Sequence, residues 1–217
     1  MAGLAAAALL AVVFVVLSLV ERGFLARVGW SSIRRTSVEW PSLLERGPHG
    51  WVLQVAFVIG GMFGLVFSAA LWSRATSRKE RVGPLGLGVL SAAVSCMAFP
   101  PNLPASPVRW TNVVHNTVYP IIPVAALVAA FALVSDRRAG RGRQRVSSAL
   151  FLALSFVALG LTFVSAIAQV ARSAFFAALL LWIAYLAWVE LRDYLGAKQR
   201  GFSMQYQLIP EQRSRQP

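Results

Sequence analysis

Six long apolar runs dominate this chain and leave few ways in which it could fold. They cover residues 3–20, 51–72, 83–99, 113–135, 148–170 and 174–189. A run of roughly 18 or more apolar residues without charge is typical of a membrane-spanning helix, because every backbone N–H and C=O group must find an internal partner once water is absent. We therefore predict an all-α, polytopic membrane protein, a bundle of six transmembrane helices.

The composition agrees with this class. Hydrophobic residues make up 57% of the 217 positions and charged residues only 13%, which excludes an ordinary soluble core. We expect one six-helix transmembrane domain over residues 1–195 and a polar, basic cytoplasmic tail over residues 196–217. The first run is interpreted as a retained helix and not a cleaved secretory signal, because no Lys or Arg precedes it and no small-residue cleavage site follows it.

The net charge of +13 lies in the connections between the apolar runs, which argues against nucleic-acid binding. With a cytoplasmic N-terminus, fourteen of the 21 Lys and Arg residues fall on the inner side and seven on the outer side. Because Lys and Arg are retained in short cytoplasmic loops, this excess predicts that both termini are cytoplasmic and that the chain is a multi-pass protein of the cytoplasmic (plasma) membrane. The opposite orientation stays open, since the first outer loop holds five arginines. We attribute the basic residues of the loops to membrane topology and to attraction by anionic lipid headgroups. Binding of a specific ligand is the alternative.

Small and polar residues indicate how the helices pack. Glycines in the second run and small residues in the third would let two helix backbones approach closely in lipid. A tight turn around residues 171–173 should make the last two helices antiparallel neighbours. The fifth run carries a seven-residue polar repeat, which predicts hydrogen bonding inside the bundle or, alternatively, a polar pathway. The residues concerned are Gly60, Gly61, Gly64, Gly88, Ser91, Ser95, Ser148, Ser155, Thr162 and Gln169.

A group of polar residues lies at the start of the fourth run, directly after a Pro-rich outer loop over residues 100–112. Asn112, His115, Asn116 and Tyr119 are spaced to share one helical face near the outer interface. A histidine at membrane depth can carry a proton near neutral pH. Three interpretations remain open: a buried structural histidine bonded to the Pro-rich loop or a facing helix, a contact to a headgroup or substrate, and a metal ligand.

The metal interpretation is the weakest of the three. His49 and His115 are the only histidines and Cys96 is the only cysteine, so a zinc site rich in nitrogen and sulfur cannot be assembled. We therefore expect neither a metal nor a cofactor. Glu39 and Glu45 of the first outer loop could complement His115, although loop carboxylates are usually solvated. No nucleophile elbow, phosphate loop or zinc-protease motif is present.

Short motifs suggest a family. The run Cys96-Met97-Ala98-Phe99-Pro100-Pro101-Asn102, followed by His115-Asn116, resembles the Phe-Pro and His-Asn pattern of the bacterial "domain of unknown function 998" membrane proteins. The stretch Ser37-Val38-Glu39-Trp40, followed by Gly50-Trp51, is similar to the region before that family's second helix. The resemblance spans about residues 37–195. It implies a six-helix protein of the cytoplasmic membrane, distantly similar to eukaryotic six-span proteins of lipid remodelling, and it supplies no established reaction.

Two functions from different classes follow. The first is a non-enzymatic protein that binds membrane lipids or a protein partner through the outer Pro-rich loop and the face made by Asn112, His115, Asn116 and Tyr119, with Glu39 nearby; a homo-oligomer is compatible with it. The second is a small membrane-embedded enzyme acting on a lipid or prenyl substrate, which would need a second titratable group beside His115. A channel or transporter is less favoured, because no run carries a row of charges.

The predicted orientation can be tested by cysteine labelling. Cysteines introduced at Ser77 and Gly140 should resist a membrane-impermeant thiol reagent in intact cells, whereas a cysteine at Ser106 should react. Labelling of the Gly140 variant from outside would overturn the orientation.

Overall fold

A computed structural model describes residues 1–30, 42–103, 107–136, 142–164 and 167–213, and within these ranges every regular element is a helix. The elements, in chain order, are α1 (Ala2–Val20), α2 (Arg22–Arg27), the short 3₁₀ helix η1 (Ser42–Arg46), α3 (Gly50–Trp72), α4 (Arg78–Cys96), α5 (Trp110–Val118), α6 (Ile121–Ser135), α7 (Gly142–Leu161) and α8 (Ala168–Arg213).

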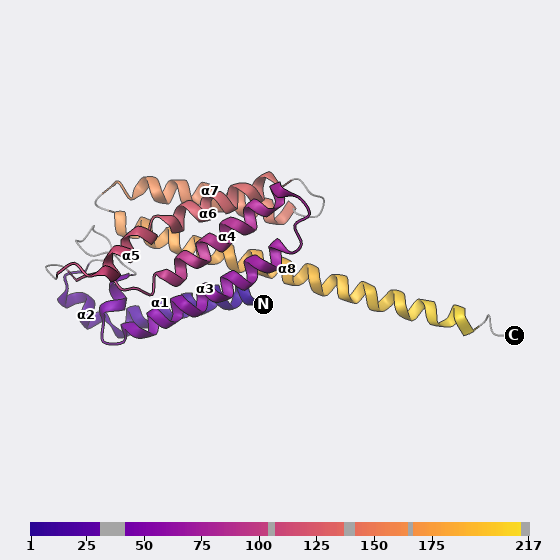
Figure 1. The fold of residues 1–217 in the computed structure, drawn as a ribbon, viewed down its shortest axis with the longest axis horizontal. Coiled ribbons are helices and arrows are strands. Elements are labelled where there is room, and N and C mark those ends of the chain that lie inside the picture. The colour runs from indigo at the N-terminus through magenta and orange to yellow at the C-terminus, as the bar shows by residue number, and fades with distance from the viewer. Residues whose placement is uncertain (31–41, 104–106, 137–141, 165–166, 214–217) are drawn as a thin grey trace.

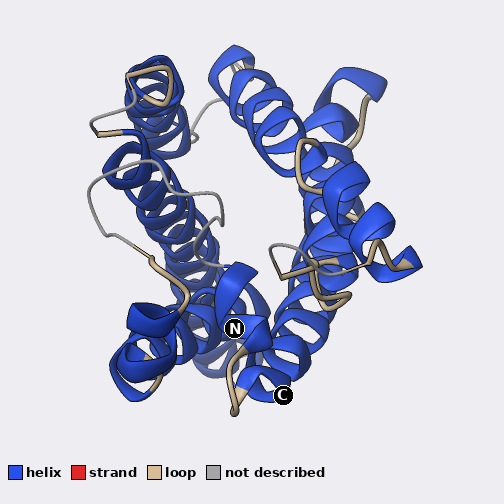
Figure 2. Ribbon diagram, turned by 90° about the vertical axis from the view of Figure 1, so that its left-hand side faces the viewer, coloured by secondary structure: helices blue, strands red, loops and turns tan. Residues whose placement is uncertain are grey.

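The long helices form a ring in chain order. Each packs against the next, from α1 through α3, α4, α6 and α7 to α8, and α8 packs back against α1. Figure 1 shows them running along a common axis, with the C-terminal part of α8 projecting beyond the others, and Figure 2 looks along that axis. Because long helices that follow one another in the chain are also neighbours in space, the arrangement is that of an up-and-down bundle.

Five helical segments are long and apolar enough to cross a membrane: Ala2–Val20, Gly50–Trp72, Trp110–Ser135, Gly142–Leu161 and Ala168–Ala197. They indicate a multi-pass membrane protein. The predicted third run differs from the others because α4 begins with the charged sequence Arg78-Lys79-Glu80-Arg81 and is less apolar overall. It nevertheless lies in the bundle between α3 and α6.

The fourth predicted run is divided into two helices. Tyr119 and Pro120 separate α5 from α6, because proline has no N–H group to continue the helical hydrogen bonds. Pro123 lies in the first turn of α6, where an N–H group has no intrahelical partner to lose.

The turn predicted at residues 171–173 is wrong. The connection lies between Leu161 and Ala168, and residues 171–173 are part of α8. Nothing at these positions breaks a helix, whereas the backbone N–H and the hydroxyl of Thr162 both bond to carbonyls of the last turn of α7, where the helix ends. At its other end α8 continues through residue 195 to Arg213, and the division between domain and tail stays a prediction.

The polar repeat predicted for one helix is divided between two, because Thr162 follows the end of α7 and Gln169 belongs to α8, but three of its four residues face protein. Ser148 and Ser155 of α7 are fully buried, and Gln169, which belongs to α8, is 1% exposed. The indole N–H of Trp182 donates to the Ser148 hydroxyl at 3.1 Å. This contact favours hydrogen bonding inside the bundle as the role of Ser148.

Glycines allow α3 and α4 to approach closely. A Cβ atom on Gly64 would lie 3.0 Å from the Ser91 Cβ, and one on Gly61 would lie 2.6 Å from the Ser91 carbonyl oxygen. On the other side of α3, a Cβ on Gly60 would lie 3.1 Å from Leu10 of α1. The glycines thus line interfaces, as the sequence predicts, and leave no room for larger side chains.

Replacing Gly64 with Leu should force α3 and α4 apart. We expect a loss of stability of about 1–3 kcal/mol, the usual range for overpacking, and a lower melting temperature in detergent. Leu65→Ile is the matched control, because Leu65 is 41% exposed and lies on another face. Equal melting of both variants would show that Gly64 does not line an interface.

Candidate functional site

His115 lies at the end of the bundle where α3 begins, α4 ends and α5 begins. It is 3% exposed, which confirms that it faces protein. Its Nδ1 lies 2.8 Å from the carbonyl oxygen of Phe99, and its Nε2 lies 2.9 Å from the Ser42 hydroxyl. A carbonyl oxygen only accepts, so Nδ1 carries the hydrogen and a neutral ring accepts the Ser42 hydroxyl proton at Nε2.

Glu45 is buried beside this histidine. Its side chain has no exposed area, and its Oε1 lies 3.8 Å from the His115 Nδ1. Burial raises the pKa of Glu45 from 4.5 to about 9, against the opposing effect of the neighbouring Arg46 charge. The expectation that this loop carboxylate is solvated is therefore wrong, because η1 folds under the ends of the helices and not out into solvent.

The Pro-rich loop is fixed to this cluster by hydrogen bonds. The Arg46 guanidinium donates to the carbonyl oxygen of Pro101 and, at 3.3 Å, to that of Pro100. The Asn112 side-chain oxygen accepts from the Asn102 N–H at 2.9 Å. Burial and the positive charge of Arg109 lower the pKa of Arg46. The loop is therefore held by one residue on each side, one from η1 and one from α5.

The predicted polar face does not form one surface. Asn112 and His115 converge on the Pro-rich loop, and the Tyr119 ring lies 6.4 Å from the Phe176 ring of α8. Asn116 is exposed, whereas the neighbouring His115 is the buried residue of the short helix α5. Glu39 lies outside the described residues.

A second buried carboxyl group supports the same end of the bundle. Glu21, 3% exposed, accepts from both the backbone N–H and the Nδ1 of His49, each at 2.8 Å. The pair joins the end of α1 to the start of α3. In the described ranges, no three His, Cys, Asp or Glu side chains come together as a metal site would require.

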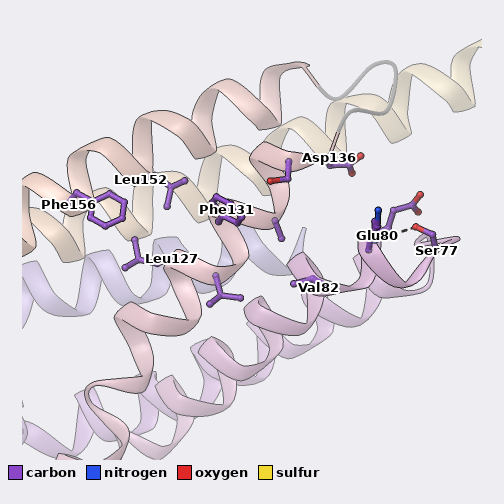
Figure 3. A pocket seen from close by; sticks show the side chains of 12 residues that line it. Ser77, Glu80, Val82, Leu127, Phe131, Asp136, Leu152 and Phe156 are labelled. Carbon is purple, nitrogen blue, oxygen red and sulfur yellow. Dashed lines mark hydrogen bonds between the residues drawn. The ribbon is translucent and has the colours of Figure 1, made fainter.

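A groove of about 820 Å³ lies at the opposite end, between α4, α6 and α7. Figure 3 shows apolar side chains of α6 and α7 within it and charged residues at its end. Its lining consists of Ser77, Lys79, Glu80, Val82, Leu127, Val128, Phe131, Ala132, Ser135, Asp136, Leu152 and Phe156. Sequence analysis did not predict this groove, because a space between three helices leaves no local motif in the sequence.

Sequence analysis also did not identify Ser42 as a site residue. Ser42 is part of no recognisable motif, and only the fold brings it next to His115, 73 positions away in the chain. The one available signal was the histidine itself, which needs a partner when it is buried.

Fold and site together define a helical, multi-pass membrane protein with a buried polar cluster at one end and an apolar groove at the other. The chain matches the model of the family described as "Protein of unknown function (DUF998)" over residues 4–191. It belongs to this family, as the motifs in its sequence indicate. No curated protein and no solved structure matches it.

The buried Glu45 should make stability depend on pH. The folded protein keeps the Glu45 proton up to about pH 9, whereas the unfolded chain releases it near the ordinary pKa of 4.5. Unfolding is therefore favoured progressively as the pH rises between these values. Glu45→Gln removes this dependence, so its melting temperature in detergent should rise relative to the wild type by a growing margin between pH 5.5 and 9.

Asp193→Asn is the control for this experiment, because the Asp193 carboxylate is exposed and lies 3.7 Å from the Arg192 guanidinium. Its melting temperature should follow that of the wild type at every pH. A constant difference between Glu45→Gln and the wild type would contradict the elevated pKa of Glu45.

Proposed function

We propose that this protein is a six-span protein of the cytoplasmic membrane, with both termini inside, that binds a membrane phospholipid in the groove between α4, α6 and α7. The observation that carries the proposal is the combination of a large apolar groove with a charged mouth. Its volume of about 820 Å³ falls within the range of small-molecule sites, about 300–1,000 Å³.

The groove has the same polarity profile as a phospholipid. Val128, Phe131, Leu152 and Phe156 offer apolar surface along α6 and α7, which suits acyl chains. Lys79 and Asp136 lie at the mouth, next to the ends of α4 and α6, where a headgroup would be placed. A long apolar ligand with one polar end is abundant in a membrane, which makes a phospholipid the natural occupant.

The sixth span is α4. From residue 82 to residue 96 it carries no charged side chain, and its charged first turn lies at the end of the bundle. Lys and Arg at such a position can extend toward the headgroups while their stems remain in the apolar layer. Packing between α3 and α6 supports membrane insertion of α4, since both neighbours belong to apolar spans.

The residues that share one end of the bundle support the proposed orientation. Met1, Arg74 and Glu190 line the same small cavity, so the N-terminus, the α3–α4 connection and the middle of α8 lie together. Further Lys and Arg residues flank this end, namely Arg78, Lys79, Arg81, Arg143, Arg145 and Arg192. The positive-inside rule assigns this end to the cytoplasm.

Lipid binding through the outer His115 face has less support. His115 and Ser42 are 3% and 4% exposed, and Asn112 is engaged with the Pro-rich loop. A ligand therefore finds more accessible surface in the groove than at this cluster.

Filling the groove tests the proposal. Val128→Trp places a large ring in the lining and should remove most of the phospholipid that remains bound in native mass spectra of the detergent-purified protein. Val124→Trp is the matched control, because Val124 lies one turn earlier on α6, is 60% exposed and does not line the groove. Wild-type protein without retained phospholipid, or equal retention by both variants, would contradict lipid binding in the groove.

A further inference from the structure

Ser42 differs from the other buried serines for which a hydrogen bond is described. Ser68 donates to the Pro84 carbonyl at 2.6 Å and Ser91 to the Leu87 carbonyl at 2.7 Å, which is the usual way for a buried hydroxyl to be satisfied in a helix. Ser148 accepts from an indole. Ser42 instead lies 2.9 Å from an imidazole nitrogen, the one partner in this set that can remove its proton.

The surroundings of His115 fix the ring in the form that a general base requires. The Phe99 carbonyl accepts the Nδ1 hydrogen at 2.8 Å, which leaves the lone pair of Nε2 directed at the Ser42 hydroxyl. In serine hydrolases a third group orients the histidine in the same way, and the arrangement is recognised by geometry and roles and not by fold.

We propose that Ser42 and His115 form a nucleophile and general-base pair that acts on ester-linked lipids at the outer end of the bundle. The cluster lies beside the start of α3 and the end of α4, at the depth where a membrane span meets the interface. The ester carbonyls of glycerolipids lie in this interfacial layer. The exposed rings of Phe99 and Trp110, 5.2 Å apart, flank the cluster and suit the same layer.

The reaction consists of two balanced steps. The Ser42 oxygen attacks the ester carbonyl while its proton passes to Nε2 of His115, and the ester C–O bond breaks as the alcohol leaves with that proton. Water then attacks the acyl-serine with His115 again as base, releasing the carboxylic acid and restoring the Ser42 hydroxyl. The net change is hydrolysis of an ester, with no oxidant or cofactor.

Phe99 is the positioning residue in this scheme, because its backbone carbonyl accepts the Nδ1 hydrogen of the His115 ring at 2.8 Å. The Glu45 carboxyl lies 3.8 Å from Nδ1, beyond hydrogen-bond distance. His115→Gln should abolish reactivity, because Gln offers an amide in place of a basic nitrogen.

The test is covalent labelling of the full-length protein in native membranes with an alkyl fluorophosphonate probe, which reacts with activated serines. Because Ser42 is 4% exposed, a lipid ester and the probe alike reach it only when the cluster opens locally, so labelling should be slow. We expect the adduct on Ser42 when the labelled wild-type protein is digested and mapped by mass spectrometry. An unlabelled wild-type protein, or an adduct elsewhere, would overturn the proposal without reference to any variant.

Variants give a second, independent readout. Ser42→Ala and His115→Gln should reduce labelling to background, while Ser68→Ala, a control that changes another buried serine, should label like the wild type. Gel filtration in detergent verifies that each variant is folded. Undiminished labelling of folded Ser42→Ala would equally overturn the assignment. The outcome does not depend on the groove, which lies at the opposite end of the bundle.

Discussion

The close contact between α3 and α4 is the constraint on which the rest of the structure depends. In lipid, apolar surface gives helices no drive to associate, so packing and hydrogen bonds must hold a helix that is less apolar than its neighbours. Glycines at positions 61 and 64 place the α3 backbone against Ser91, and Ser68 donates a hydrogen bond to the α4 backbone at Pro84. With α4 fixed in this way, both its ends have defined positions.

The two ends of α4 border two different sites. At its C-terminal end, the chain enters the Pro-rich loop, whose carbonyls are held by Arg46 and whose preceding residue, Phe99, orients His115. At its N-terminal end, Lys79 and Val82 complete the groove begun by α6 and α7. One helix thus positions a buried polar cluster on one side of the bundle and an apolar groove on the other.

The sequence was sufficient for features that depend on composition and spacing. It predicted the membrane-spanning helices from the apolar runs, because backbone polar groups need internal partners in lipid, and the interfacial glycines from close helix packing. It gave a buried His115 as one of three interpretations. It misplaced the last turn, since residues 171–173 contain no helix breaker and continue α8. Burial of Glu45 and the pairing of Ser42 with His115 depend on the tertiary position of η1, which local patterns do not encode.

The position of α4 in the bundle is tested most directly by a disulfide between α3 and α4. A Cβ on Gly88 would lie 3.9 Å from the Ser68 Cβ, within the usual disulfide range of about 3.5–4.5 Å. In a Cys96→Ser background, Ser68→Cys with Gly88→Cys should cross-link under mild oxidation in native membranes. The cross-link would keep the two halves joined after cleavage at a protease site inserted between the helices. Ser68→Cys with Val89→Cys is the control, because Val89 is exposed. If this control pair cross-links and the pair at positions 68 and 88 leaves the two halves separate, the packing of α3 against α4 is contradicted.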